Sequence, residues 1–162
     1  FSFLSRGVNF RNIIFYFNII VLILISTFRA ASVGTDTVVY QDMFASLDEG
    51  NVRGNEYGWF LIYRISSLFN DFRVLLFIVS SMTMFFVSKT ILDLSKNIHL
   101  SLLLFVLFYF YFASFNISRQ ILAVSICLFS VKYILTNDWK HVQIPPIYCW
   151  IYSLQKVVFS LL

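Results

Sequence analysis

Hydrophobic residues occur in long, almost uninterrupted runs that short polar segments separate. Each run approaches the roughly 20 residues that an α-helix needs to cross the core of a bilayer. Apolar side chains cover every side of the predicted helices, whereas a soluble helix concentrates them on one face. The pattern predicts an all-α protein, a polytopic transmembrane helix bundle, with crossings at residues 12–28, 74–92, 100–118 and 120–136 and a fifth candidate at 147–162.

The longest polar segment lies between the first two crossings, at residues 29–73, and holds most of the acidic residues and glycines of the chain. Chemistry is expected to concentrate there. Within it, residues 59–69 are mainly apolar, with Arg64 in the middle, and are too few for a crossing. They predict an amphipathic helix lying at the membrane interface.

The distribution of positive charge favours this surface position. If residues 59–69 do not cross, the basic residues on the cytoplasmic side are Arg6, Arg11, Lys89, Lys96, Lys132 and Lys140. If they do cross, those four lysines move outside, against the positive-inside tendency. We therefore expect an extracytoplasmic loop, followed by the interfacial helix, on the same face of the membrane as Arg119.

Composition excludes several classes of function. The chain is 59% hydrophobic and 12% charged, too little charge to cover a water-soluble surface. Its formal net charge of +4 comes from scattered single residues, which excludes a nucleic-acid-binding stripe. Cys127, Cys149, His99 and His141 lack the spacing of a metal site or redox pair, and no glycine-rich phosphate loop occurs. We expect no metal and no cofactor.

Two arginines stand at the ends of predicted crossings, Arg29 after the first and Arg119 between the third and fourth. Such a cation either extends its side chain to the headgroups or binds an anion, and the sequence leaves both interpretations open. Gly34 permits a tight turn, and the polar residues after it can cap a helix or present groups to a ligand.

These residues recur together in a known pattern. The pattern consists of Arg29, Val33-Gly34-Thr35-Asp36-Thr37 with Tyr40, Glu56-Tyr57-Gly58-Trp59, and Arg119-Gln120 with Ala123. In order and approximate spacing it resembles the EpsG-like family of bacterial membrane proteins, over about residues 28–135. Members of that family are exopolysaccharide and capsule polymerases similar to O-antigen polymerases. The resemblance implies a multi-pass protein of the bacterial inner (cytoplasmic) membrane.

The resemblance also implies a substrate, an oligosaccharide linked through diphosphate to a polyprenyl lipid, and other polysaccharide-assembly proteins as possible partners. Arg119 and Arg29 would stabilise the diphosphate leaving group, because a guanidinium donates two parallel hydrogen bonds to phosphate. Thr35, Tyr40 and Gln120 are the other expected substrate-binding residues. Asp36 is the first candidate for the general base and Glu56 the second. The alternatives, a helix cap for Asp36 and a solvated loop charge for Glu56, stay open.

Two other interpretations keep the membrane fold without the chemistry. The first is a transporter or non-catalytic subunit that binds the lipid-linked glycan; it would be expected to carry a broken segment near mid-membrane, whereas residues 100–115 read as one unbroken helix. The second is an inactive remnant. The chain starts without Met, and residues 141–162 depart from the family pattern, so we expect it to be incomplete at both ends.

Overall fold

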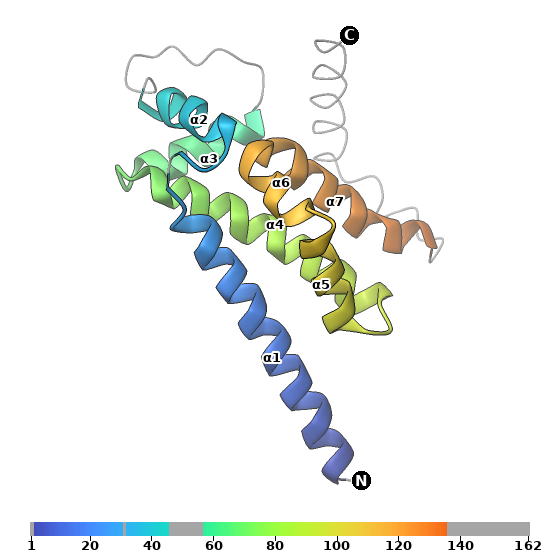
Figure 1. Cartoon of the computed structure of the whole chain (residues 1–162). Coiled ribbons are helices and arrows are strands. Elements are labelled where there is room, and N and C mark those ends of the chain that lie inside the picture. The colour runs from blue at the N-terminus through green and yellow to red at the C-terminus, as the bar shows by residue number, and fades with distance from the viewer. Residues whose placement is uncertain (1, 31, 46–56, 136–162) are drawn as a thin grey trace.

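The computed structural model describes residues 2–30, 32–45 and 57–135. In these residues the regular structure is entirely helical, which confirms the prediction of an all-α protein (Figure 1). The helices are α1 (Ser2–Thr27), α2 (Thr35–Ala45), α3 (Tyr57–Ser67), α4 (Phe72–Leu94), α5 (Ile98–Leu107), α6 (Phe110–Asn116) and α7 (Ser118–Leu135).

Two helices are long and apolar enough to cross a membrane, α1 over Phe10–Thr27 and the whole of α4. They correspond to the predicted crossings at 12–28 and 74–92. The pair α5 and α6 would add a third span if it is taken as one bent segment. Helix α7 covers most of the predicted crossing at 120–136 but is not among these candidate spans, and residues 147–162 lie outside the described part of the chain.

The segment at 100–118 differs from the prediction of one unbroken helix, which was wrong. The chain breaks at Phe108 and Tyr109, and the axes of α5 and α6 differ by 48°. Tyr109 adopts the left-handed conformation, with φ of 69°. Its N–H bonds to the carbonyl of Val106 at 3.1 Å, a tighter turn than an α-helix makes. The rings of Phe105 and Phe110 stack across the break, with centroids 6.4 Å apart.

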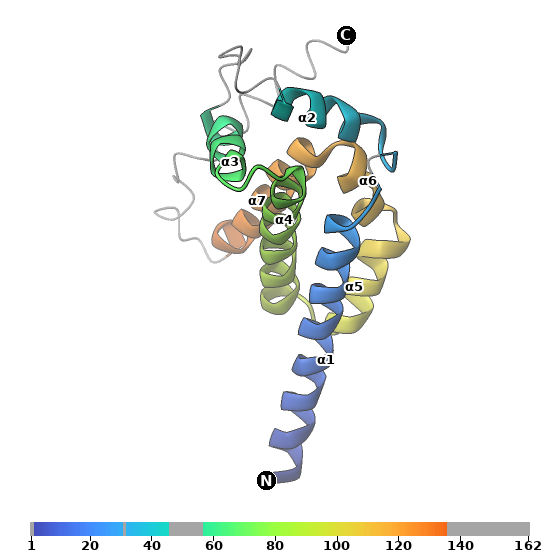
Figure 2. The same ribbon diagram turned by 90° about the vertical axis from the view of Figure 1, so that its left-hand side faces the viewer.

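The predicted loop at 29–73 also contains more helix than expected, because residues 35–45 form α2 in addition to the predicted helix α3. Helix α3 has 11 residues and is therefore about 16 Å long, too short to cross a bilayer core. It buries Trp59, Ile62 and Tyr63 and exposes Leu61 and Ile65. Both α2 and α3 lie at one end of the bundle, the end where α1 terminates (Figures 1 and 2).

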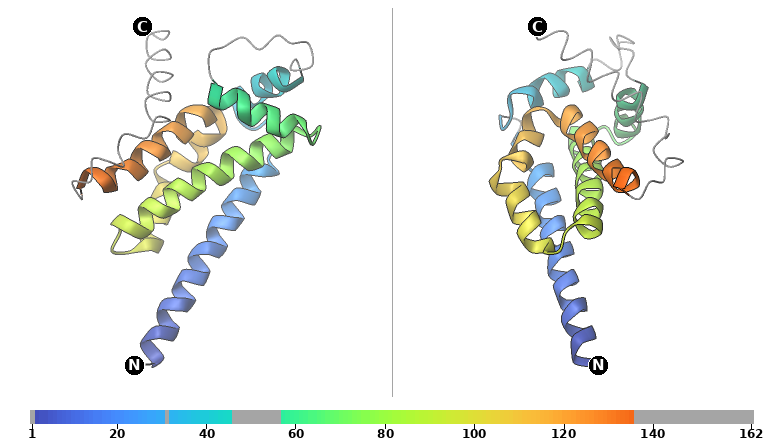
Figure 3. Two further views of the ribbon diagram at one scale, coloured as in Figure 1. Left: turned by 180° about the vertical axis from the view of Figure 1, so that it is seen from behind. Right: turned by 90° about the vertical axis from the view of Figure 1, so that its right-hand side faces the viewer.

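Helix α4 is central and contacts α1, α3, α5 and α7. The N-terminal part of α1 extends beyond the other helices (Figure 3). Helices α4 and α7 run in the same direction: Leu75 and Leu122 pack together near their N-termini, and Lys132 pairs with Asp93 at 2.8 Å near their C-termini. After a turn in which Asn97 caps α5, the chain returns through α5 and α6 to the end where α4 began. The N-termini of α4 and α7 therefore lie at the α2–α3 end.

Two groups of buried residues hold the bundle together. One joins α1, α4, α5 and α6 through Phe15, Ile19, Met84, Ile98, Leu102, Tyr111 and Phe115. The other joins α2 and α3 to α4 and α7 through Tyr40, Trp59, Ile62, Tyr63, Leu75, Val79 and Leu122. The second group is rich in aromatic side chains, and it fixes the segment between the first two spans against the end of the bundle.

Candidate functional site

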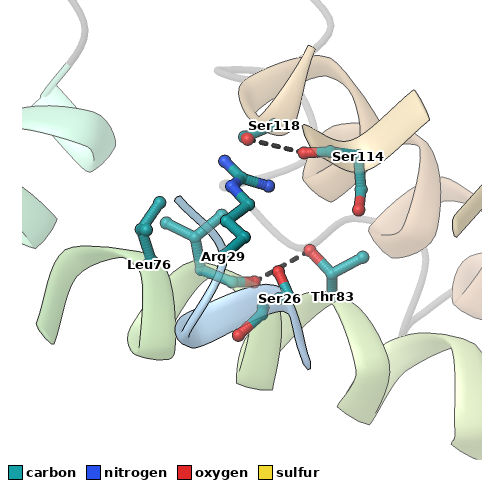
Figure 4. A pocket seen from close by; sticks show the side chains of 8 residues that line it. Ser26, Arg29, Leu76, Thr83, Ser114 and Ser118 are labelled. Atoms are coloured by element: carbon teal, nitrogen blue, oxygen red, sulfur yellow. Dashed lines mark hydrogen bonds between the residues drawn. The ribbon is translucent and has the colours of Figure 1, made fainter. Parts of the chain in front are cut away.

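Arg29 lies just beyond the end of α1, and its guanidinium group points into the bundle (Figure 4). One terminal nitrogen, Nη2, donates a hydrogen bond to Thr37 Oγ1 at 3.2 Å. The guanidinium carbon lies 4.7 Å from the centre of the Phe115 ring, a cation–π distance. Nε is buried and has no hydrogen-bond partner among the described residues. Arg29 is thus positioned by α2 and α6 but retains an unused donor.

Gly34 allows α2 to approach α6 closely enough for this arrangement. Its φ is +98°, and a Cβ at this position would lie 2.5 Å from the carbonyl oxygen of Phe115. Thr37, which is completely buried, donates from Oγ1 to the carbonyl of Val33 at 3.0 Å and lies 3.4 Å from that of Phe115. The glycine and the threonine together fasten the start of α2 to the end of α6.

A polar cavity of about 20 Å³ lies beside Arg29. It is lined by Ser26, Arg29, Leu76, Val79, Ser80, Thr83, Ser114 and Ser118. Its size suits one water molecule or one oxygen-sized group. Ser118 Oγ donates to the carbonyl of Ser114 at 2.6 Å (Figure 4), and Ser114 Oγ donates to the carbonyl of Tyr111, also at 2.6 Å. These hydroxyls offer acceptor oxygens in this state and can rotate to donate to a ligand.

Burial changes the electrostatics of Arg29. Desolvation lowers the pKa of its guanidinium below the usual value, while Tyr111 and Tyr40 act in the opposite direction. The group nevertheless stays cationic, because arginine is not deprotonated in proteins near neutral pH. A partly desolvated cation without a carboxylate partner among the described contacts attracts anions more strongly than a solvated one.

Arg119 stands in the first turn of α7 and lies against an aromatic cluster. Its guanidinium carbon is 5.4 Å from the centre of the Tyr40 ring and 5.8 Å from that of Trp59. The Tyr40 and Trp59 rings are in contact, and Tyr63 packs on Trp59 with centroids 5.5 Å apart. Trp59 Nε1 is a second buried donor without a hydrogen-bond partner in the described chain.

The predicted site residues fall into two groups. Arg29, Tyr40 and Arg119, from three distant parts of the sequence, come together at the α2–α3 end of the bundle. Gln120 lies beside Arg119 in the first turn of α7 and is half-buried. Thr35 and Asp36 begin α2, but their side chains lie outside the described part of the structure, as does the whole of Glu56.

Several residues that shape this site were not predicted from the sequence. Thr37 and Trp59 belong to the family pattern, yet nothing in the sequence showed that one would bind Arg29 and the other would contact Arg119. Ser118 precedes Arg119, which was a usable signal. Ser26 and Thr83 stand beside other hydroxyl residues, Thr27 and Ser81, within long apolar runs, where they resemble ordinary helix residues that bond to their own backbone, and no signal marked them.

The arrangement is suited to binding an anion. Two arginines lie at one end of the bundle, and the two buried side-chain atoms without partners among the described residues, Arg29 Nε and Trp59 Nε1, are both donors. Buried donors are nearly always satisfied in folded proteins, and an acceptor ligand would satisfy these.

Comparison with known proteins identifies the family of the chain. Neither curated proteins nor solved structures gave a match. The sequence model of a single family covers residues 12–144, a range that includes α1 from Asn12 onward and every other described helix. Because that range is most of the 162 residues, the protein belongs to the EpsG family.

Proposed function

We propose that this protein polymerises lipid-linked oligosaccharide repeat units during the synthesis of a cell-surface polysaccharide. Membership of the EpsG family indicates a membrane function related to polysaccharides. The observation that carries the finer proposal is the convergence of Arg29, Tyr40 and Arg119 at one end of an apolar helical bundle. The proposed donor is an oligosaccharide attached through diphosphate to a polyprenyl lipid in the bacterial cytoplasmic membrane.

In the proposed reaction, a hydroxyl group of the acceptor sugar attacks the anomeric carbon of the donor. The bond between that carbon and the diphosphate oxygen breaks, and the electron pair leaves with the lipid diphosphate. Negative charge grows on the leaving group, so guanidinium groups held in place beforehand lower the barrier. Arg29 and Arg119 are assigned this role, and Tyr40, Thr35 and Gln120 would contact the substrate around them.

The proton of the attacking hydroxyl goes to a carboxylate. Asp36 is the first candidate because its backbone lies at the start of α2, one residue before the Thr37 that binds Arg29. Glu56 is the second candidate, from the segment just before α3. The free energy for forming the new glycosidic bond comes from the activated lipid donor, so the proposed reaction needs no nucleotide.

A transporter or non-catalytic glycan-binding subunit is the main alternative, and the break between α5 and α6 bears directly on it. Transporters use such breaks to direct polar backbone ends at a substrate. Here the breakpoint residues Phe108 and Tyr109 are 68% and 60% exposed, and the neighbouring Leu107 and Phe110 are also exposed and apolar. Apart from the Tyr109 hydroxyl, the described side chains at the break are apolar, whereas Arg29 and several hydroxyl residues line the small cavity at the other end of α6.

The test is a polymerisation assay on protein reconstituted in lipid nanodiscs, with a polyprenyl diphosphate-linked oligosaccharide as the added substrate. Wild-type protein is expected to give a ladder of longer glycans. Arg29→Gln and Arg119→Gln should each lower the rate about 100-fold, the usual cost of losing one donor to a developing negative charge. Asp36→Asn should abolish the product if Asp36 is the base.

Arg64→Gln is the matched control, because Arg64 is an exposed arginine on α3 at the same end of the bundle. It should leave the rate unchanged. Wild-type rates in both Arg119→Gln and Asp36→Asn, with the variants correctly inserted, would refute the assigned roles. Absence of any product from the wild-type protein, with binding of the substrate retained, would favour the glycan-binding subunit, and absence of both would favour an inactive remnant.

A further inference from the structure

A second and larger cavity lies next to the Arg29 cavity, between α4, α5, α6 and α7, with a volume of about 310 Å³. We call it the apolar groove. Its walls are mainly hydrocarbon: α5 contributes Leu104 and Phe105, Phe108 follows from the break, and α7 contributes Ile121, Val124 and Leu128. Such a surface is suited to an apolar ligand.

The few hydroxyl groups in the groove are already engaged. Thr90 Oγ1 donates to the carbonyl of Phe86 at 2.8 Å, and Ser125 Oγ donates to that of Leu122 at 2.7 Å. Ser101 Oγ pairs with Ser95 Oγ at 2.6 Å. Because these groups are satisfied within the protein, the groove does not require a polar occupant.

The groove continues the polar cavity along the same helices. On α4 the polar cavity reaches Thr83 and the groove begins at Val87, one helical turn or about 6 Å further on. On α6 the corresponding residues, Ser114 and Phe110, are again one turn apart. On α7 the change comes between Ser118 and Ile121. On each of the three helices a hydroxyl residue that lines the polar cavity is therefore followed, within about one turn away from the α2–α3 end, by an apolar residue that lines the groove.

This order matches an amphiphile whose anionic head binds at Arg29 and whose chain extends away from the α2–α3 end. We infer, on the basis of the proposed function, that the apolar groove binds the first isoprenoid units of the polyprenyl diphosphate carrier. A dry cavity of about 150 Å³ holds one benzene molecule. The volume of the groove, about 310 Å³, therefore suits roughly two to three five-carbon units.

The experiment measures binding of radiolabelled farnesyl diphosphate, a short isoprenoid diphosphate, to the full chain in nanodiscs, with empty nanodiscs subtracted. Val124→Trp fills the groove from a half-exposed position on α7, so the bulk can be accommodated. It should weaken farnesyl diphosphate binding at least 10-fold. The affinity for inorganic diphosphate, measured by competition, should stay unchanged. Leu135→Trp, at an exposed position on α7 outside the groove, is the control and should bind as wild type.

The outcomes separate this inference from the proposed function. If Arg29→Gln weakens binding and Val124→Trp does not, the groove is not the chain site, while the proposed function stands. If Val124→Trp weakens binding but Arg29→Gln and Arg119→Gln do not, the head group does not bind at the arginines. The proposed function then fails, and the groove is not connected to a diphosphate site. Equal competition by straight-chain dodecyl diphosphate would assign the groove to lipid acyl chains in general and overturn the isoprenoid assignment.

A second variant and a second measurement guard against misfolding of Val124→Trp. Leu104→Trp fills the groove from the opposite wall and should have the same effect. A photoreactive farnesyl diphosphate should label wild-type protein within residues 104–108 or 121–128. Labelling confined to the outer surface of α1 would contradict the inference.

Discussion

Gly34 shows how one small residue determines whether the site forms. Its φ of +98°, and the 2.5 Å that would separate an added Cβ from the Phe115 carbonyl oxygen, leave no room for a side chain. Arg29 depends on this contact, because Thr37, which binds it, lies three residues further along α2 and reaches the same carbonyl.

We therefore expect Gly34→Ala to lower the stability of the protein by roughly 2 kcal/mol, the sum of a left-handed backbone and a steric clash. Gly58→Ala is the matched control, since Gly58 is exposed within α3, where alanine should be neutral or stabilise by about 0.5–1 kcal/mol. Both are measured by unfolding in mixed micelles. Equal stability of Gly34→Ala and wild type would show that the approach of α2 to α6 is not close.

Among the helices, the break between α5 and α6 depends on the conformation of Tyr109. A non-glycine residue in the left-handed region costs roughly 1–2 kcal/mol, so glycine should be preferred at this position over alanine. We expect Tyr109→Gly to be more stable than Tyr109→Ala by about 1 kcal/mol.

The opposite order is expected at Phe112, an exposed position within α6, where alanine should exceed glycine by about 1 kcal/mol. The stabilities are measured by unfolding in mixed micelles. Because both variants of each pair lack the aromatic ring, its loss cancels in the difference between alanine and glycine. If alanine is the better residue at both positions, the chain continues through Tyr109 as regular helix and the break is absent.

The helices and their interruptions were not equally predictable. The apolar runs predicted α1 and α4 because length and hydrophobicity alone identify a span. The break at Tyr109 lies in an aromatic segment without glycine or proline, so no local signal marked it. The two arginines were visible as cations at the ends of apolar runs, but the contact of Arg29 with Phe115 and that of Arg119 with Tyr40 depend on tertiary packing, which the hydrophobic pattern does not contain.

In the whole molecule, we expect the α2–α3 end and the turn after α4 to lie on opposite sides of the membrane, which labelling can test. Helix α4 has 23 residues and a length of about 35 Å, more than the roughly 30 Å core of a bilayer. In a background in which Cys127 and Cys149 are replaced by serine, Ser32→Cys and Ser67→Cys should react with an impermeant thiol reagent from one side of the membrane. Lys96→Cys, in the turn after α4, should react only from the other side.

Reaction of all three cysteines from the same side would mean that α4 does not cross the membrane. Labelling at Ser32 and Ser67 from opposite sides would separate α2 from α3 and remove the shared site. The side on which the first two cysteines react also tests the extracytoplasmic position that the distribution of positive charge predicts.

The ion pair between Asp93 and Lys132 has a mechanical consequence. It joins α4 to α7 at the end opposite Arg29, while Ser118 lies at the N-terminus of α7, about 21 Å away along the helix axis. Rotating α7 by about 8° around this fixed point would displace Ser118 by about 3 Å, the width of one phosphate oxygen. Such a tilt would widen the narrow cavity beside Arg29, but it would also displace Leu122, which is completely buried, so a larger anion requires repacking of the core between α7 and α4.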